Sequence, residues 1–399
     1  MTFLGIRPDI IRTRRLLEML DQGQKKFGYE HVYVHSGQHF DYQLDGVFRK
    51  QLGVRRADLD LRIGKILKKT CKTSHVHQSA LLFTKTAEML DKIRPNAVMY
   101  LGDTNTVTSA LIVAKYGVPV IHIEGGGRSY DWRMPEEKNR ILVDHLSDVI
   151  YCYLERYKNI LMSEGIPSYR QVVVGNIIVD ALNDFMSEAD NSPILNRLRL
   201  EPKRYALCTI HREENIDNRD ILAAKLQGLR EFAKHIPVVF PLMPRVRARV
   251  KDFRLEKLLC VRRLTCTEPL GFLDFLKLES AARVIVTDSG TVQEEALILG
   301  VPCLVTRRST ERPETIAAGA TILADDDLCA NAQRAMQMDT GWNRETLNPS
   351  GGSPSERIYK DLMEKIQSSF FEKSRTIEML RINPFARQAY GQEACESYA

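Results

Sequence analysis

Short apolar runs alternate with amphipathic segments along the whole chain, and this alternation limits the possible folds more than any other feature. Each apolar run is short enough for a buried strand, and the stretches between the runs place apolar residues at helical spacing. In the first half we expect strands at residues 3–5, 31–35, 97–101, 119–123, 149–152 and 171–174, and helices at residues 10–20, 81–93, 109–116 and 156–162. This order predicts a parallel, doubly wound α/β sheet with right-handed crossovers.

A break in the alternation divides the chain. Residues 187–203 contain Asn191, Pro193 and Pro202 and show little apolar periodicity, which is typical of a linker between domains. The alternation then resumes, with expected strands at residues 206–209, 237–242, 258–261, 283–287 and 301–305 and expected helices at residues 221–234, 292–299 and 355–371. We therefore predict a Rossmann-like domain at 1–186, the linker at 187–203, a second Rossmann-like domain at 204–370, and a tail at 371–399 that packs back or is partly flexible. Two such domains would face each other across a central cleft.

Composition excludes several classes of protein. With 399 residues, 44% of them hydrophobic, the chain is globular and too long for one ordinary core. The 57 Lys and Arg residues only slightly outnumber the 51 Asp and Glu residues and are spread along the chain, so we expect no nucleic-acid partner. The basic run at residues 245–254 is most simply a helix with a solvated basic face.

The chain carries no signal for export or for a membrane. Its start, MTFLGIRPD, has no basic segment followed by an apolar core and a cleavage site, although it leaves the first strand short and possible truncation open. No stretch approaches the roughly 18 apolar residues of a transmembrane helix. We therefore expect a cytoplasmic protein. The eight cysteines are scattered without Cys-x-x-Cys spacing, so we expect reduced, mostly packed thiols and no metal site.

Residues 122–140, with the sequence HIEGGGRSYDWRMPEEKNR, carry the strongest signal of a site. Glu124 directly follows the apolar run at 119–123, and the carboxyl ends of parallel strands line the ligand crevice of such a sheet. The glycines after it let another group approach the backbone closely. Downstream, Glu136 and Arg140 lie one turn apart near the expected start of a helix, where a surface ion pair would explain them equally well.

Polar residues also fall at other expected strand ends. Arg7 and Arg12, at the start of the first helix, suit a phosphate group. Asp103 ends a strand of the first half, and His211 ends the first strand of the second half. Taken singly, Asp103 could be a helix N-cap and His211 a structural histidine. Their shared position at the predicted cleft favours a site.

The sequence at residues 288–290, Asp-Ser-Gly, leads into another expected helix. Backbone amides at the helix start could bind a diphosphate, and a carboxylate in its first turns, such as that of Glu295, could bind ribose hydroxyls. Ser289 could also be only an N-cap. No G-x-G-x-x-G follows the first strand and the sequence has no P-loop, so nothing indicates NAD or ATP.

Nine short motifs occur in order along the chain. They are GIRPD at residues 5–9, SGQH at 36–39, GDTNT at 102–106, EGGGRS at 124–129, PEEKNR at 135–140, GN at 175–176, HREEN at 211–215, TDSGTVQEEALILGVP at 287–302 and TERPE at 310–314. In this order they resemble the non-hydrolysing UDP-N-acetylglucosamine 2-epimerase family. The resemblance extends from residue 3 to about residue 358, nearly the whole chain.

The resemblance implies a fold, an activity and a set of residues. The family has the two-domain GT-B fold, needs no nicotinamide or metal cofactor, is usually dimeric, and converts UDP-N-acetylglucosamine to UDP-N-acetylmannosamine for surface polysaccharide precursors. The catalytic residues that it implies are Asp103, Glu124, Glu136, Arg140 and His211. The residues that it implies around the UDP moiety are Arg7, Arg12, Phe275, Ser289, Gly290, Glu295 and Arg312.

The chain also departs from the family pattern. Gly125-Gly126-Gly127 stands where Ala-Gly-Leu is usual, which predicts a more flexible loop. Arg12 replaces a common lysine, and Thr291 replaces a second glycine. Met243 stands where many members carry a histidine that belongs to a regulatory substrate site.

The chemistry of the reaction fits these residues. No carbonyl adjoins C2 of an acetamido sugar, so direct removal of the C2 proton is implausible. The family instead eliminates UDP to form a bound glycal and then adds it back, which requires acid/base groups on both faces of the ring. Asp103, Glu124, Glu136 and His211 supply such groups, but which acid serves which face stays open.

Several alternatives share part of this pattern. A GT-B UDP-sugar glycosyltransferase would share residues 289–295 but would not need the acids of the first half. A hydrolysing epimerase usually carries Gly-Asp-Arg where this chain has Gly102-Asp103-Thr104. A UDP-sugar sensor without activity, or an epimerase of a 6-deoxy or diacetamido UDP-sugar, also stays open.

Overall fold

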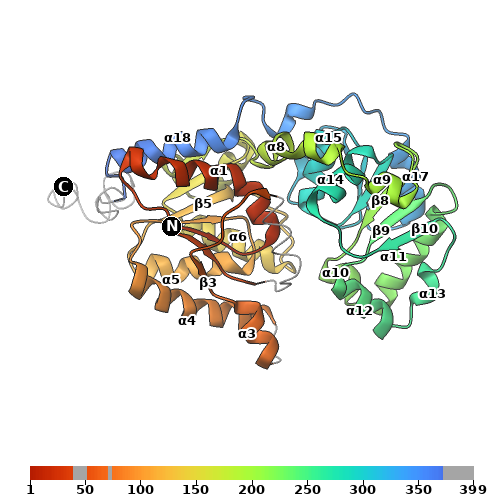
Figure 1. Ribbon diagram of the computed structural model, residues 1–399, viewed down its shortest axis with the longest axis horizontal. Coiled ribbons are helices and arrows are strands. Elements are labelled where there is room, and N and C mark those ends of the chain that lie inside the picture. Colours follow the sequence, from red (N-terminus) through yellow and green to blue (C-terminus); the bar gives the residue numbers. More distant parts are fainter. Residues whose placement is uncertain (39–51, 71–73, 372–399) are drawn as a thin grey trace.

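The structure is a computed structural model that describes residues 1–38, 52–70 and 74–371. His39 of the second motif, Cys71, and the predicted tail beyond residue 371, which includes Cys395, lie outside the described residues. Two lobes, each built on one parallel β-sheet with helices around it, make up the molecule (Figure 1). The two-domain α/β fold predicted from the alternation is thus confirmed.

The first lobe contains a seven-stranded sheet with the order β3-β2-β1-β4-β5-β6-β7. Its strands are β1 (Thr2–Leu4), β2 (Tyr33–His35), β3 (Leu59–Asp60), β4 (Val98–Leu101), β5 (Val120–Gly125), β6 (Val149–Cys152) and β7 (Gln171–Val173). All neighbouring strands are parallel. Because the order reverses between β1 and β4, the loops after these two strands diverge and leave the crevice that such sheets use for ligands.

The second lobe repeats the arrangement with a six-stranded sheet of order β10-β9-β8-β11-β12-β13. Its strands are β8 (Ala206–Thr209), β9 (Val238–Pro241), β10 (Leu264–Thr267), β11 (Val284–Thr287), β12 (Cys303–Val305) and β13 (Thr321–Leu323). These strands are also parallel, and the order reverses between β8 and β11.

Helices connect the strands and cover both sheets (Figure 1). In the first lobe they are α1 (Arg7–Phe27), α3 (Ile63–Thr70), α4 (His75–Ile93), η1 (Asn105–Ser109), α5 (Ala110–Lys115), α6 (Pro135–Leu146), α7 (Glu155–Ser163), η2 (Ser168–Arg170) and α8 (Ile178–Asp190). The later helices are α9 (Ile194–Leu198), α10 (Glu213–Ile216), α11 (Arg219–Phe232), α12 (Pro244–Asp252), α13 (Glu256–Leu259), α14 (Phe272–Ala281), α15 (Gly290–Leu299), α16 (Pro313–Ala317), α17 (Leu328–Met336), η3 (Arg344–Leu347) and α18 (Pro354–Gln367).

Helix α1 shows how the sequence sets local structure. The carboxylate of Asp9 accepts hydrogen bonds from the backbone amides of Gly5 and Ile6, which caps the helix where its amides have no other partner. Gly28 ends the helix in the left-handed conformation (φ 68°) that glycine adopts without strain. One face, with Ile10 and Leu16, is completely buried against the sheet. Burial of such side chains stabilises a fold by roughly 1.5–3 kcal/mol each.

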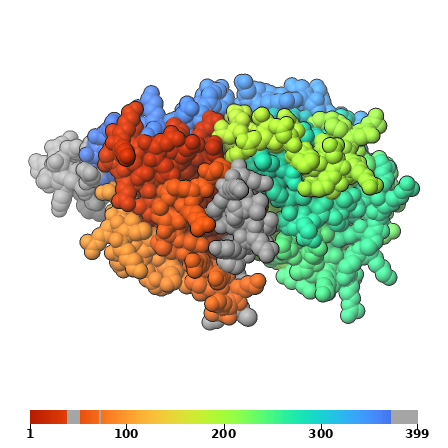
Figure 2. Space-filling model, in the orientation of Figure 1, coloured from red at the N-terminus to blue at the C-terminus, as the bar shows by residue number. Residues whose placement is uncertain are grey.

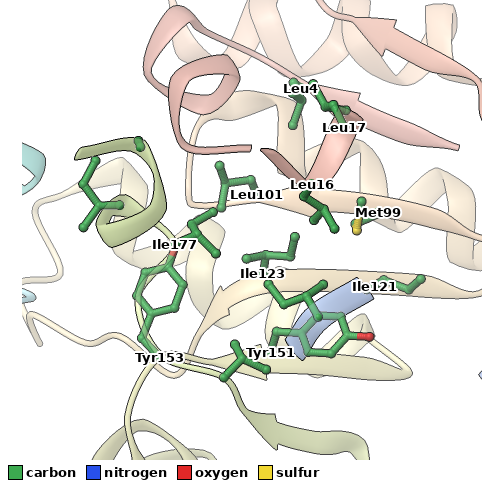
Figure 3. Close-up of a cluster of buried hydrophobic side chains, with 14 of the residues drawn as sticks. Leu4, Leu16, Leu17, Met99, Leu101, Ile121, Ile123, Tyr151, Tyr153 and Ile177 are labelled. Carbon is green, nitrogen blue, oxygen red and sulfur yellow. The ribbon is translucent and has the colours of Figure 1, made fainter. Parts of the chain in front are cut away.

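The core of the first lobe lies between this helix layer and the sheet (Figure 3). Side chains from several strands meet there with α1 and the start of α8, and they include Leu4, Leu16, Leu17, Met99, Leu101, Ile121, Ile123, Tyr151, Tyr153 and Ile177. Because a close-packed interior leaves little free space, this packing holds the strand ends, and therefore the residues that follow them, in fixed positions.

The chain returns to the first lobe after completing the second. Helix α18 packs against α1 and α8, and its residues Ile358 and Leu362 belong to the core of the first lobe. Tyr151 Oη donates a hydrogen bond to Asp361 Oδ2 at 2.8 Å. The two passages of the chain between the lobes run along the same side of the molecule (Figures 1 and 2).

One predicted strand is wrong. Residues 258–261 are predicted to be extended, but α13 ends at Leu259, and the next strand, β10, begins only at Leu264. Leu255, Leu258 and Leu259 pack on the second core at helical spacing, and a short apolar run does not by itself distinguish helix from strand. The predicted linker, residues 187–203, contains the end of α8 and the short helix α9.

Other expectations can be compared with the described residues. Cys152, Cys208, Cys260, Cys266, Cys303 and Cys329 are all unpaired, and half of them are buried. The basic run forms α12, as expected, and its arginines Arg245 and Arg249 pair with acids of α10 and its C-cap, including Asp217. None of the described helices combines the length and apolarity needed to cross a membrane.

Candidate active site

The candidate site lies where loops at the strand ends of the two lobes meet. From the first lobe come the loop after β4, which carries Asp103, and the end of β5, which carries Glu124. From the second lobe comes the segment between β12 and α16, which carries Glu311 and Arg312. Glu124 pairs directly with Arg312. Arg140 of α6, which holds Asp103, lies 3.6 Å from Glu311. Asp103 follows β4 as expected, whereas Glu124 lies inside β5, one residue before its end, because the strand extends beyond the predicted apolar run.

Glu124 lies between two arginines. One carboxylate oxygen pairs with Arg12 of α1 and the other pairs with Arg312 of the second lobe. Only 6% of Glu124 is exposed to solvent. Its backbone has φ 79°, a left-handed conformation that is unusual for a residue other than glycine, at an irregularity in the pairing of β5 with β6. Strained residues of this kind cluster at functional sites.

Arg312 connects Glu124 with a further buried acid. Its Nε lies against Glu294 Oε1, and Asn176 Nδ2 donates to the same oxygen of Glu294 at 2.8 Å. Glu294 has no exposed surface. Burial, which Arg312 only partly offsets and Glu124 reinforces, raises the pKa of Glu294 to about 8.

Asp103 belongs to a second charge cluster beside the first. Arg140 Nη2 donates to Asp103 Oδ2 at 2.5 Å, Arg140 Nη1 donates to Glu137 Oε2 at 2.6 Å, and Glu311 Oε1 lies 3.6 Å from Arg140 Nη2. Burial alone would raise the pKa of Asp103, but the arginines around it, with Arg140 first, hold the pKa below its usual range. Asp103 is therefore an ionised base in this arrangement.

Glu136 does not pair with Arg140, so the surface ion pair that their spacing suggested is not formed. The nearest cation to Glu136 is Arg212 of the second lobe, with Nη1 3.9 Å from Oε1. Arg140 instead donates a hydrogen bond to Glu137. The carboxylate of Glu137 also accepts hydrogen bonds from the backbone amides of Ser129 and Tyr130. Glu136 thus stays accessible to solvent where the lobes meet, with its side chain 31% exposed.

His211 lies at the predicted strand end and pairs with Asp288. Its Nδ1 is 2.8 Å from Asp288 Oδ1, and its backbone amide donates to the same carboxylate. Burial alone would raise the pKa of Asp288, but His211 and the other donors lower it. This contact fixes one ring nitrogen of His211 and leaves the half-exposed ring facing outwards.

The residues predicted around UDP lie on α14, on α15 and its N-cap, at the start of α16, and on α1. Ser289 accepts a hydrogen bond from Val292 at 3.5 Å and is the N-cap of α15, as one of the two interpretations of this residue required. A Cβ added at Gly290 would lie 2.7 Å from Glu311 Oε1, so any other residue there would displace the Glu311 carboxylate. Phe275 packs on the core below, and Arg7 lies in the first turn of α1.

Glu295 faces another acid. It lies on α15 beside Glu279 of α14, whose carboxylate has no exposed surface. Burial raises the pKa of Glu295 to about 7, and burial together with Glu295 raises the pKa of Glu279 well above its ordinary value. The pair therefore holds at least one proton at neutral pH.

Sequence reasoning missed several residues of this site. Glu137, Glu294, Arg307 and Glu311 all lie inside the quoted motifs or beside them, but the neighbouring residues were selected in their place. Arg307 is 1% exposed and pairs with Glu311 at 3.0 Å. Their charge at buried positions is visible only in the structure, although the doubled acids of PEEKNR and QEE were a signal that more than one carboxylate is used.

The arrangement can move protons and bind an anion. Three acids, Asp103, Glu124 and Glu136, lie at the meeting of the lobes with Arg12 and Arg312, which suit a diphosphate. Within the ranges that the structure describes, no three His, Cys, Asp or Glu side chains are grouped so that they could hold a metal ion. Independence from metal stays a prediction.

Comparisons with known proteins decide the family. Residues 22–360 match the family model described as UDP-N-acetylglucosamine 2-epimerase. The chain belongs to the UDP-N-acetylglucosamine 2-epimerase family. It is 36% identical over 368 residues to the UDP-N-acetylglucosamine 2-epimerase of Methanocaldococcus jannaschii, which covers 90% of this chain and 97% of the relative.

Solved structures and another relative support membership of this epimerase family. The structure of the M. jannaschii enzyme in complex with UDP-GlcNAc and UDP superposes with a TM-score of 0.83 at 34% identity, covering 91% of this chain and 99% of that one. The UDP-2,3-diacetamido-2,3-dideoxy-D-glucuronate 2-epimerase of Pseudomonas aeruginosa is 32% identical over 366 residues, 90% of this chain and 97% of the relative. The family, the fold and the enzyme class inferred from the motifs are confirmed.

Proposed function

We propose that this epimerase inverts C2 of a UDP-2-acetamido sugar without hydrolysing it, with UDP-N-acetylglucosamine and UDP-N-acetylmannosamine as the two epimers. The observation that carries the proposal is the convergence of Asp103 and Glu124 from one lobe with Glu311 and Arg312 from the other. A nucleotide sugar that lies between the lobes would expose its sugar to the acids and its diphosphate to the arginines.

The reaction proceeds by elimination and re-addition. A base removes the C2 proton while the C1–O bond breaks and the electron pair leaves with UDP, which gives a 2-acetamidoglucal. UDP then attacks C1 of the glycal again, and an acid delivers a proton to the opposite face of C2. Each acid/base group typically contributes a factor of about a hundred to ten thousand to such a rate.

The residues around the cleft suit these steps. Asp103 is ionised beside Arg140 and is fit to accept a proton. Glu136 is 3.9 Å from Arg212 of the second lobe, a weak contact that leaves its side chain room to move towards a substrate. Arg12 and Arg312 can stabilise the charge that develops on departing UDP. The proposal does not assign one acid to one face of the sugar.

The diacetamido sugar is the second candidate substrate. The P. aeruginosa relative named for that activity matches this chain over nearly the same length as the UDP-N-acetylglucosamine 2-epimerases. A glycosyltransferase is less well supported, since a rice enzyme with the related fold has a TM-score of 0.55 at 12% identity, a likeness of fold alone. We further propose a cytoplasmic homodimer that supplies precursors for surface polysaccharides.

The test is exchange at C2 in deuterated water. We incubate the protein with UDP-N-acetylglucosamine, without metal, nicotinamide or acceptor, and follow C2 by NMR. Elimination and re-addition must place solvent deuterium on C2 of the intact UDP-sugar in both epimers. Replacing Glu136 with Gln keeps the shape but removes the proton chemistry, so exchange should fall at least about a hundredfold while UDP binding survives.

The other outcomes identify the alternatives. Retention of the C2 proton with transfer to an added acceptor indicates a glycosyltransferase, and accumulation of a free mannosamine derivative with UDP indicates a hydrolysing enzyme. UDP binding without exchange on UDP-N-acetylglucosamine, followed by exchange on a diacetamido or 6-deoxy sugar, changes the substrate. Absence of exchange with all of these sugars would contradict the proposed function.

A further inference from the structure

A buried histidine–aspartate pair lies directly behind the two acids of the first lobe. His122 and Asp144 have no exposed surface. His122 Nδ1 is 2.7 Å from Asp144 Oδ1, and His122 Nε2 is 2.8 Å from the carbonyl oxygen of Gly102. His122 precedes Glu124 by two residues and Gly102 precedes Asp103 by one, so the pair connects the segments that carry both acids.

The hydrogen bonds place a hydrogen on one ring nitrogen. A carbonyl oxygen only accepts, so His122 Nε2 carries a hydrogen. Burial alone would raise the pKa of Asp144, but His122 and Arg128 outweigh it and hold that pKa low. Arg128 Nη1 lies 2.7 Å from Asp144 Oδ2, and Arg128 Nη2 pairs with Glu164.

Asp144 holds the backbone on both sides of Glu124. Asp144 Oδ1 is hydrogen-bonded to the ring of His122, two residues before Glu124. Asp144 Oδ2 accepts a hydrogen bond at 3.1 Å from the backbone amide of Gly126, two residues after it. Between these two anchors, Glu124 has the left-handed φ of 79°. A non-glycine residue in such a conformation costs on the order of 1–3 kcal/mol and persists only when its surroundings hold it. Asp144 supplies that restraint from α6.

The other end of the pair reaches the strand that carries Asp103. Gly102 is itself left-handed (φ 71°), and its amide donates to the carbonyl oxygen of Ile123 at 3.1 Å. A Cβ built at Gly102 would lie 3.4 Å from Glu124 Oε2, so the two acid-bearing segments are in close approach. The His122 Nε2–H bond to Gly102 fixes the separation of these segments from behind.

We propose that His122 and Asp144 are positioning residues that set the relative placement of Asp103 and Glu124 for proton transfer at C2. Neither side chain reaches the cleft, so both act through the backbone of the acids. This inference rests on the proposed function insofar as Asp103 and Glu124 move protons. A misplacement of about 1 Å far from the chemistry can cost on the order of a hundredfold in rate.

Asp144→Asn is the first test. The amide has the same shape, but one of its two ends presents N–H where Gly126, Arg128 and His122 also present N–H, so one anchor of Glu124 is lost. We expect kcat for C2 exchange to fall on the order of tenfold to a hundredfold. We expect KM and the Kd for UDP to change little, because Arg12 and Arg312 are untouched.

Asp148→Asn is the matched control. Asp148 Oδ2 accepts the backbone amide of Val120 at 2.8 Å, at the opposite end of β5 from Glu124, and Asp148 is also buried. Its loss should lower the melting temperature as Asp144→Asn does but leave kcat close to that of the wild type. Equal kcat in the two variants would overturn the positioning role.

The hydrogen on His122 Nε2 gives a second readout that needs no substrate and no variant. The Nε2 ¹⁵N resonance of His122 in the wild-type protein should show an attached proton, because Nε2 donates to the carbonyl oxygen of Gly102. A ring without a proton on Nε2 would overturn the proposal even if Asp144→Asn fails to fold. His122→Gln, which can still donate to Gly102, should keep more activity than His122→Leu, which cannot; equal losses would count against it.

Failure of the positioning role can be distinguished from failure of the proposed function. If the wild type exchanges no UDP-sugar at C2, the proposed function fails while the ring spectrum is unchanged. If the wild type exchanges normally and Asp144→Asn exchanges at the same rate, only the positioning role fails.

Discussion

Glu124 of the first lobe is paired with Arg312 of the second, and its other oxygen is paired with Arg12. The carboxylate therefore occupies the place between two guanidinium groups that an anionic ligand would take. Tyr157 joins the lobes nearby through a 2.6 Å hydrogen bond to Glu314. A diphosphate that binds both arginines would displace Glu124 from them, and the freed carboxylate would then be available for proton transfer beside Asp103.

Glu124→Gln should separate the two consequences of this pairing. Breaking a buried ion pair by removing one partner typically costs about 3–5 kcal/mol, because the partner charge stays buried without compensation. The variant should melt at a lower temperature than the wild type and recover more stability on addition of UDP, since the diphosphate then compensates both arginines. C2 exchange should be lost. A UDP-induced rise in melting temperature no larger than that of the wild type would contradict the place-holder role.

Arg140→Lys should reduce activity more than the conserved charge suggests. Arg140 holds Asp103 with one nitrogen and Glu137 with another, and a lysine cannot reproduce this fork. We expect kcat to fall on the order of a hundredfold with little change in UDP affinity. Arg133→Lys is the control, because Arg133 also pairs with an aspartate, Asp131, but is exposed. A similar loss in both variants would show that the geometry around Asp103 is unimportant.

The sequence predicted the positions of the acids better than their partners. Glu124 and Asp103 follow apolar runs that form β5 and β4, so the regular topology of a parallel sheet was enough to locate them. The pairing of Arg140 with Glu137 in place of Glu136 could not be predicted. Both acids lie within one turn of the arginine, and the direction in which α6 presents them depends on its packing against the sheet.

Contacts between the lobes could not be predicted from the sequence either. Glu294 and Glu311 are buried by residues more than a hundred positions away, such as Asn176 and Arg140. Local patterns contain no information on which strand-end loops of two separate sheets will meet. The motifs contain Glu294 and Glu311, but the ion pairs of these acids depend on how one lobe is placed against the other.

The kinetics should be hyperbolic. Met243 is 44% exposed and is the N-cap residue of α12, with a side chain that makes no cap hydrogen bond. A thioether cannot donate to a phosphate or a hydroxyl as an imidazole can, so a second substrate site at this position would lack that donor. Initial rates against UDP-N-acetylglucosamine should show no requirement for priming. A clearly sigmoidal rate curve for the wild type would contradict this prediction. So would a wild-type curve that is hyperbolic and becomes sigmoidal when Met243 is replaced by Ala.

Stability should fall as pH rises through the neutral range, in part because of Glu294. Its pKa is raised by burial from 4.5 to about 8, so the folded state binds a proton there that the unfolded state has already released. The contribution of Glu294 to the free energy of unfolding is therefore full below about pH 4.5 and is lost progressively as pH rises towards 8. Glu294→Gln has no proton to release, so its melting temperature should decline less than that of the wild type over this window. Glu256→Gln is the matched control, because Glu256 is exposed and its carboxyl is already solvated. Melting temperatures measured at intervals across the window decide the matter, and parallel curves for the wild type and Glu294→Gln would show that Glu294 is ionised throughout.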